Sequence, residues 1–436
     1  MTSRALRPFW PLPPWLFVMS TVAVCVVALY GTWSMLLWPY QEWARTSAQF
    51  HQQTALAGPI AAAAAAYLAG RLCQPSRIFA TPIALRAGWP TASRHLVSLW
   101  TILIGGYVAG LAPVVALTVD RAEYGGPDIL AITSGLCAMA ASISVGYLLG
   151  VVIRATAVAP PTALLLVFAV TVIGAGGGAR TASVVPVTYA EPSLGHEQSW
   201  AVVLFRSLLF LTVAAVAAVL ASGLLRMFRP KWRPPRYSRV ALAIAPLLMI
   251  AWGVSTAPDL FSRPADPPAR CVVAAGIDYC VHEGHASQLE LLVDTLAPVF
   301  EAYGNKPHLL DRVSDRALAD AEEDLTDHTY VIDIVPTSPL PGRDSHSDDR
   351  SRLADILAGV GVCLADQPRV RRHELGDTTS SFGIALELAG WLDTDQHTGE
   401  TPTVFAGIPR ERVQAWIAAN QVRINSCALE RDDLPR

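Results

Sequence analysis

Seven apolar runs in the first 256 residues place the strongest constraint on how this chain can fold. Each run is close to the roughly 20 residues that an α-helix needs to cross the hydrocarbon core of a bilayer. The runs cover residues 15–38, 54–70, 96–119, 129–153, 159–176, 200–225 and 240–256. They predict an α-helical polytopic membrane domain over residues 1–256.

Two of these runs admit another interpretation. The run 54–70 is rich in Ala, so a buried or re-entrant segment is the alternative to a full crossing. The run 15–38 follows Arg4 and Arg7, as the apolar core of a signal peptide would. It is longer than such a core and lacks a small-residue cleavage site, so we expect a helix that remains in the protein.

Charge divides the chain into two parts. Residues 1–256 carry 17 Lys and Arg against 6 Asp and Glu, whereas residues 257–436 carry 16 against 30. With a mean hydropathy of +0.36, this predicts a basic part in contact with a lipid bilayer and an acidic, water-soluble part. An acidic soluble part disfavours nucleic acid as a partner, because phosphate binding needs a basic surface.

The arginines also predict an orientation, because Lys and Arg concentrate in cytoplasmic loops. With the N-terminus inside, the cytoplasmic segments are the N-terminal tail and residues 71–95, 154–158 and 226–239, which hold 13 basic residues. The external loops contribute only Arg45, Arg121 and Arg180. All but two of the 33 basic residues are arginines, a bias typical of GC-rich bacterial genomes. We therefore expect a multi-pass protein of a bacterial cell membrane, with a cytoplasmic N-terminus and an extracytoplasmic C-terminal domain.

The connector 71–95 is long for a cytoplasmic loop. Its four arginines, Arg71, Arg77, Arg86 and Arg94, alternate with apolar residues. One interpretation is a short helix along the inner membrane face that docks a cytoplasmic partner. The other is a topological anchor that anionic lipid holds in place.

Arg206 is the one charged residue inside the seven runs. One interpretation is that its side chain faces a translocation pathway or an acidic loop residue, Glu191 or Glu197. The other is that its guanidinium reaches the outer membrane interface. The runs contain no Asp, Glu, His or Lys, which disfavours a carrier coupled to protons or sodium. The glycine-rich stretch 174–178 lacks the Lys-Ser/Thr of a phosphate-binding loop.

Residues 257–269 are predicted to form a Pro-rich linker, and residues 270–436 a soluble α+β domain. Cys271 and Cys280 flank an expected hairpin turn, which favours their pairing and leaves Cys363 for Cys427. Four cysteines allow three pairings, and four free thiols are the alternative. Disulfides are chemically permitted outside the cytoplasm. The cysteines of the membrane part, Cys25, Cys73 and Cys137, are predicted to be unpaired.

The rest of the soluble domain alternates helical and strand patterns. Helices are predicted over residues 287–303, 350–360, 382–392 and 409–421, and a strand over 330–335. Ser380 or Ser381 is the expected N-cap of the third of these helices.

Four polar clusters in the soluble domain resemble parts of active sites, but none completes one. The motif HEGH at 282–285 has histidines at i and i+3, not the i and i+4 of a zinc-protease helix, and is interpreted as an exposed loop or a helix entry. The segments 373–377, 378–381 and 320–327 lack a second histidine, a nucleophile elbow and the spacing of a calcium loop, respectively. No catalytic, metal-binding or cofactor-binding residue is predicted, and the chain is not expected to be an enzyme.

The layout of residues 1–226 resembles the permease subunit of a type-two ABC exporter. Its basis is six nearly charge-free helices with both ends inside, a basic connector after the second helix and an external loop before the sixth. The run Cys271…Cys280-Val281-His282 also resembles the opening of outer domains attached to actinobacterial permease-like proteins, although Glu283 stands where those carry proline.

This resemblance implies export by a dimer of half-transporters that a separate cytoplasmic ATPase energises. The ATPase would dock on the arginines of the connector 71–95, and the outer domain would contact cargo or envelope components. Two rival functions stay open: a membrane-anchored, hydrolase-like enzyme, and a sensor or assembly scaffold with an outer binding module.

Overall fold

The computed structural model describes residues 12–38, 41–73, 88–177, 194–227, 236–256, 259–262, 266–304, 310–319, 325–326, 328–334, 345–366, 380–393, 404–405 and 407–435. These residues form two compact units, Met1–Ala265 and Asp266–Arg436. The division between the units falls inside the predicted linker 257–269.

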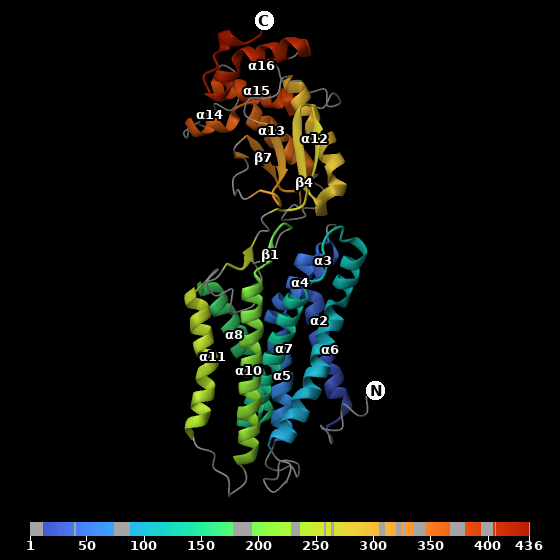
Figure 1. The fold of residues 1–436 in the computed structure, drawn as a ribbon, viewed down its shortest axis with the longest axis vertical. Helices are drawn as coiled ribbons and strands as arrows, with labels where there is room; N and C mark the ends of the chain where they lie inside the picture. The colour runs from blue at the N-terminus through green and yellow to red at the C-terminus, as the bar shows by residue number, and fades with distance from the viewer. Residues whose placement is uncertain are drawn as a thin grey trace. The chain divides into compact units, whose positions relative to one another are not determined.

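The first unit, here called the membrane unit, is built from helices (Figure 1). They are α2 (Pro14–Gly31), α3 (Trp33–Leu36), α4 (Trp43–Gln52), α5 (Thr54–Leu72), α6 (Trp89–Arg121), α7 (Ile129–Ile153), η3 (Thr156–Val158), α8 (Ala159–Gly177), α10 (Trp200–Met227) and α11 (Arg236–Thr256). The strands β1 (Glu197–Gln198) and β2 (Phe261–Ser262) pair antiparallel beside them.

A helix lies at each of the seven predicted runs, and five stretches are long and apolar enough to cross a membrane. These five are Pro14–Gly31, Trp43–Leu72, Trp89–Arg121, Ile129–Ile153 and Trp200–Leu225. Over the described residues, the apolar helices Thr156–Val172 and Ile244–Thr256 are shorter. The chain is therefore an α-helical protein with the character of a membrane protein, and a total of seven crossings stays a prediction.

Several helices of the membrane unit differ from the predicted ones. Helix α2 ends at Gly31 rather than at residue 38, and the carbonyls of Met35 and Trp38 are bound by the Gln41 side-chain amide at 2.7 and 2.9 Å. Helix α4 was not predicted at all. Helices α5 and α6 extend into the predicted connector, which leaves residues 73–88 between them.

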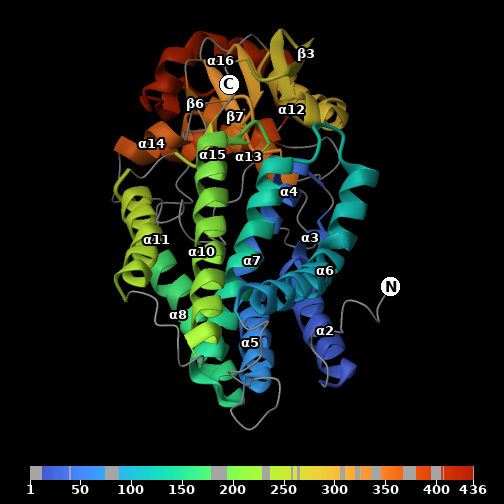
Figure 2. The ribbon, with the colours of Figure 1, turned by 60° about the horizontal axis from the view of Figure 1, so that its bottom comes forward.

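Small residues allow the helices of the membrane unit to pack closely. Helix α7 lies against α4, α5 and α10, as Figure 2 shows for α10. A Cβ atom added at Gly146 of α7 would lie 2.1 Å from the Ala62 carbonyl oxygen of α5. At Gly110 of α6 it would lie 2.5 Å from the Cys25 carbonyl oxygen of α2. Close packing on glycine is typical of helix pairs in lipid, where no hydrophobic effect drives helices together.

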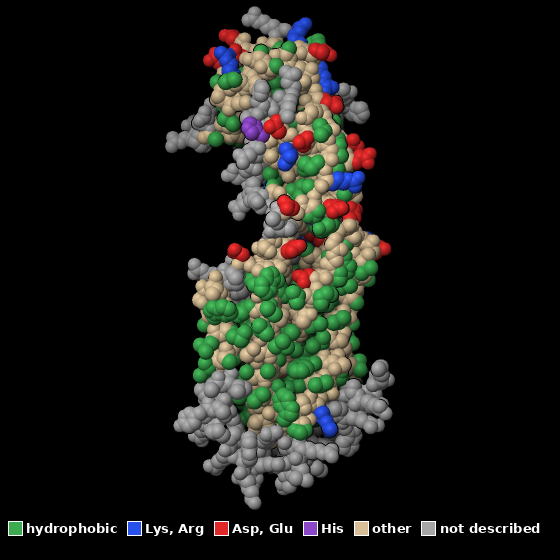
Figure 3. Space-filling view, in the orientation of Figure 1, with side chains coloured by type: hydrophobic (Ala, Val, Ile, Leu, Met, Phe, Trp, Pro, Cys, Tyr) green, Lys and Arg blue, Asp and Glu red, His purple; other side chains and the backbone are tan. Residues whose placement is uncertain are grey.

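The outward surface of the membrane unit is apolar. Large exposed side chains include Met19, Phe168, Leu208 and Leu248. In Figure 3, hydrophobic side chains gather over the helices of the membrane unit, and charged side chains are sparse among them. A surface of this kind is stable against acyl chains and unfavourable in water.

The second unit, here called the soluble unit, contains a five-stranded sheet of order β3-β4-β5-β7-β6. Its elements are β3 (Ala269–Ala274), β4 (Ile277–His282), η4 (Glu283–Gln288), α12 (Leu289–Tyr303), β5 (Arg312–Asp315), β6 (Leu325–Thr326), β7 (Thr329–Ile332), α13 (Ser345–Leu357), α14 (Val360–Asp366), α15 (Ser381–Asp393), α16 (Arg410–Asn425) and η5 (Arg431–Asp433). Strands β4, β5 and β7 are parallel, and the two edge strands are antiparallel to their neighbours.

The predicted hairpin is present as β3 and β4. Ala275 and Gly276 form its two-residue turn with φ of 48° and 77°, the conformation that matches the twist of the flanking strands. Within the register, Cys271 lies directly opposite Cys280.

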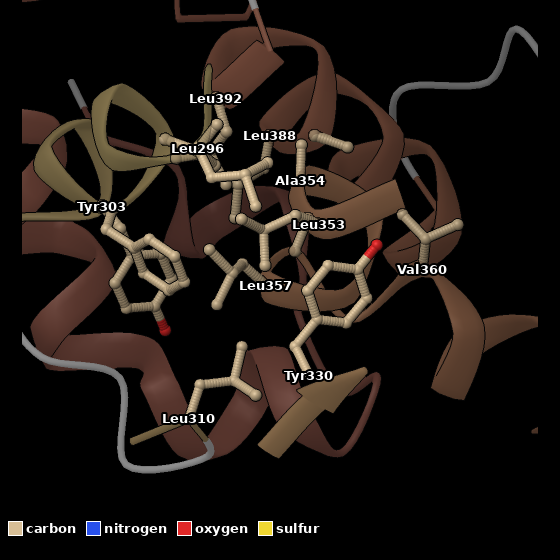
Figure 4. Close-up of a cluster of buried hydrophobic side chains, with 14 of the residues drawn as sticks. Leu296, Tyr303, Leu310, Tyr330, Leu353, Ala354, Leu357, Val360, Leu388 and Leu392 are labelled. Carbon is tan, nitrogen blue, oxygen red and sulfur yellow. The ribbon is translucent and has the colours of Figure 1, made fainter. Parts of the chain in front are cut away.

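The core of the soluble unit joins the sheet to helices α12, α13 and α15 (Figure 4). Leu296, Leu353, Leu357 and Leu388 are at most 1% exposed. The four predicted helices and the predicted strand of this unit correspond to α12, α13, α15, α16 and β7, with shifted ends. Ser380 is the N-cap of α15, because its Oγ accepts the Gly383 N–H at 3.0 Å.

Candidate functional site

Arg206 lies in the second turn of α10, where its side chain is 8% exposed. Of the predicted alternatives for its partner, Glu197 is exposed in β1 and Glu191 lies outside the described residues. Arg206 lines a small cavity together with side chains from α4 and from the β1–β2 pair.

Helix α4 is the element that completes this cavity. It is rich in polar residues, yet residues 46–52 are all buried within the membrane unit. The bonds that hold it come from helices far along the chain. Tyr107 donates to the Phe50 carbonyl oxygen at 2.8 Å, and the hydroxyls of Thr46 and Thr118 lie 2.7 Å apart.

A glutamine chain fixes the end of α4. Gln53 donates to Gln49 Oε1 at 2.7 Å and to the Gly31 carbonyl oxygen of α2 at 3.0 Å. Gln49 in turn donates to Gln52 Oε1 at 3.0 Å. Buried amides that are paired in this way are stable in a low-dielectric interior, and they orient Gln52 at the cavity.

The lining of the cavity combines polar and apolar groups. The seven lining residues are Ala48, His51, Gln52, Gln198, Arg206, Leu260 and Phe261. His51 is 4% exposed, and its ring centroid lies 5.7 Å from that of Phe210. Among the described lining residues none is acidic, so the cavity presents one fixed positive charge and several hydrogen-bonding groups.

The four arginines predicted to dock an ATPase are only partly described. Arg71 is in the last turn of α5 and donates to the Tyr67 hydroxyl at 2.9 Å. Arg94 is exposed near the start of α6. Arg77 and Arg86 lie outside the described residues, so the predicted grouping of the four stays a prediction.

The structure places both predicted cysteine pairs at disulfide-bonding distance. The sulfur atoms are 2.08 Å apart in Cys271–Cys280 and 1.99 Å apart in Cys363–Cys427. The first pair joins β3 to β4, and the second joins α14 to the segment after α16. The three other cysteines are free thiols.

A second polar cluster lies in the soluble unit, at the carboxyl ends of β4 and β5. Asp315 Oδ2 is 2.6 Å from His285 Nδ1 and accepts the His282 N–H at 3.1 Å, while Oδ1 accepts the Ala317 N–H at 2.9 Å. His282 and His285 are 1% and 5% exposed. Of the two alternatives for this motif, the helix entry is present, because η4 begins at Glu283. The two histidines are buried beside Asp315, whereas Glu283 is exposed.

In this cluster the Asp315 carboxylate fixes the orientation of the His285 imidazole. Asp315 accepts from Nδ1, which leaves Nε2 free to act as a base in the neutral imidazole. Within the part of the chain that the structure describes, Nε2 has no hydrogen-bonding partner, and no group of three or more His, Cys, Asp or Glu residues is placed to hold a metal ion. The clusters 373–377 and 320–324 lie outside that part.

Sequence reasoning identified Arg206 but missed His51, Gln52 and Gln198. They lie in stretches without apolar periodicity, and they meet Arg206 only through the fold of α4 and the β1–β2 pairing. The available signal was a polar but almost uncharged stretch, residues 46–53, directly before an Ala-rich run.

Comparison of the chain with protein-family models, with curated proteins and with solved structures found no match.

Proposed function

We propose that this chain is the membrane permease subunit of an export system whose energy comes from a separate ATPase. The observation that carries the proposal is a bundle of apolar helices whose seven apolar runs contain no carboxylate, while a charged residue, Arg206, is buried close to one end of its run. Membrane-embedded charges are costly and usually functional. Without a titrating carboxylate in the spans, coupling to an ion gradient lacks its usual chemical group.

The arrangement in the membrane follows from the distribution of charge and cysteines. The N-terminus and the connector 71–95 are on the cytoplasmic side, where the ATPase docks on Arg71, Arg77, Arg86 and Arg94. The soluble unit is extracytoplasmic, where its two disulfides are chemically stable, and it contacts cargo or envelope components. Two copies pair as half-transporters.

Affinity purification of the full-length protein in mild detergent, followed by mass spectrometry, tests this proposal. We expect an ATPase subunit with the wild-type chain and with Arg121→Gln, which removes an exposed arginine at the opposite end of α6. The double variant Arg77→Glu/Arg86→Glu should retain much less of it, because reversed charges oppose docking.

The outcomes separate the two parts of the proposal. If no ATPase accompanies an otherwise intact complex, export by this mechanism is wrong. If the ATPase remains bound to the double variant, the connector is not its docking site, although the permease assignment stands.

A second candidate function, an enzyme in the soluble unit, has support in the His285–Asp315 pair. A carboxylate that holds an imidazole in one tautomer is the arrangement of many general bases.

Screening the full-length protein against ester and peptide substrates tests this candidate. Activity should fall at least about 100-fold in His285→Gln and persist in His328→Asn, which changes an exposed histidine. Equal activity in both variants would count against it.

A further inference from the structure

The cavity beside Arg206 has the chemistry of an anion site. The guanidinium is positively charged at every physiological pH and offers five N–H donors in a planar fork that fits phosphate or carboxylate oxygens. Gln52 and Gln198 add side-chain amides that can donate, and His51 adds an imidazole. Because none of the described lining residues is acidic, nothing among them repels a negative charge.

Three residues of the lining are apolar, which narrows the class of ligand. They are Ala48, Leu260 and Phe261. A free inorganic anion gains nothing from these side chains. An amphiphile gains from both the polar and the apolar lining residues, because its charged group meets Arg206 while its apolar part covers Leu260 and Phe261.

The depth of the cavity matches that of a lipid headgroup. Trp200, at the first position of α10, is 69% exposed, as is typical of aromatic residues at a membrane interface. Arg206 lies six residues further on, which is about 9 Å along the helix axis. This depth corresponds to the boundary between the lipid headgroups and the acyl chains.

We propose that this cavity binds the anionic headgroup of an amphiphile, such as the phosphate of an anionic phospholipid. The cavity is small and only partly enclosed, so the phosphate oxygens enter it while the apolar part of the molecule extends away past Leu260 and Phe261. Arg206 interacts with other groups of the chain as well. Its five donors allow it to hold a headgroup and keep such contacts. Binding of the headgroup is independent of the proposed export function, since it requires no ATPase.

Lipid retention by the full-length protein tests this proposal. The protein is purified, incorporated into nanodiscs of phosphatidylcholine with one fifth phosphatidylglycerol, and released in a native mass spectrometer. We expect bound phosphatidylglycerol with the wild-type chain and about tenfold less with Arg206→Gln, since charge-assisted hydrogen bonds are lost. The control Arg121→Gln removes an exposed arginine outside the cavity and should bind as the wild type does.

A second variant keeps the test valid if Arg206→Gln does not fold. Gln198→Glu is nearly isosteric, sits in the partly exposed strand β1 and adds a negative charge to the lining, so it should also reduce binding about tenfold.

Two further results decide the outcome. Inorganic phosphate added at millimolar concentration should leave phosphatidylglycerol bound. Efficient displacement by phosphate would identify a site for the free anion and overturn the amphiphile. Equal retention by Gln198→Glu and the wild-type chain would overturn the site.

Discussion

His282 is a buried histidine whose ionisation the fold opposes. Desolvation lowers the pKa of its imidazole below the usual 6.5, and His285 acts in the same direction, whereas Asp315 and Glu283 oppose the shift. Its Nδ1 already accepts the Gly284 N–H at 3.1 Å, so a proton on Nδ1 would break that bond. The folded chain therefore prefers the neutral imidazole.

This preference predicts a pH dependence of stability. The unfolded chain binds a proton below about pH 6.5, and the folded chain binds it only at lower pH, so the free energy of unfolding should fall as the pH falls from about 6.5. The variant His282→Asn keeps an acceptor for the Gly284 N–H but does not titrate. Its melting temperature should change less between pH 7.5 and 5.5 than that of the wild-type protein.

Thermal unfolding of the full-length protein at the two pH values provides the measurement. His328→Asn changes an exposed histidine and should keep the wild-type pH dependence. If His282→Asn also keeps it, His282 is not the group responsible.

At the scale of helices, Gly105 and Gly110 of α6 allow the effect of close packing on stability to be separated from the effect of helix propensity. A Cβ atom added at Gly110 would lie 2.5 Å from the Cys25 carbonyl oxygen and 2.8 Å from the Ala28 Cβ of α2, whereas at Gly105 it would meet nothing within 4 Å. Backbone atoms cannot move aside as the end of a flexible side chain can.

Gly110→Ala should therefore destabilise the membrane unit, and Gly105→Ala should not. Both changes gain the same intrinsic helix propensity, so their difference isolates the contact between α2 and α6. We expect Gly110→Ala to cost about 1–3 kcal/mol, the usual range for an overpacked interior. Thermal unfolding in detergent checks the expectation, and equal melting temperatures of the two variants would contradict it.

The same elements show how far the sequence predicts the fold. The long helices follow from apolar length and the absence of charge, both of which are local properties. Helix α4 does not follow, because the burial of its polar residues depends on contacts with distant parts of the chain. Tyr107 and Thr118, for example, lie more than 50 residues away from the α4 residues that they contact. Arg206 could be identified as a lone charge in an apolar run, whereas the contribution of Gln198 depends on the pairing of β1 with β2.

For the whole molecule, the proposed orientation is supported by the distribution of charge and by the chemistry of the cysteines. The membrane unit contains free thiols, and the soluble unit contains two cysteine pairs at bonding distance. Disulfides persist outside the cytoplasm and are rare within it. The arginine-rich segments 71–95 and 226–239 lie on the cytoplasmic side under the same orientation, as the preference of Lys and Arg requires. The two arguments are independent, since one concerns redox chemistry and the other membrane insertion.

Thiol labelling of intact cells tests this orientation directly. In a chain whose free cysteines Cys25, Cys73 and Cys137 are replaced by Ala, a membrane-impermeant maleimide should label Glu411→Cys, an exposed position of α16. It should label Ser76→Cys, in the connector, only after the membrane is permeabilised. The chain without an added cysteine should remain unlabelled, because its four other cysteines are oxidised. The reverse pattern would place the soluble unit in the cytoplasm, where neither the disulfides nor the arginine distribution would be explained.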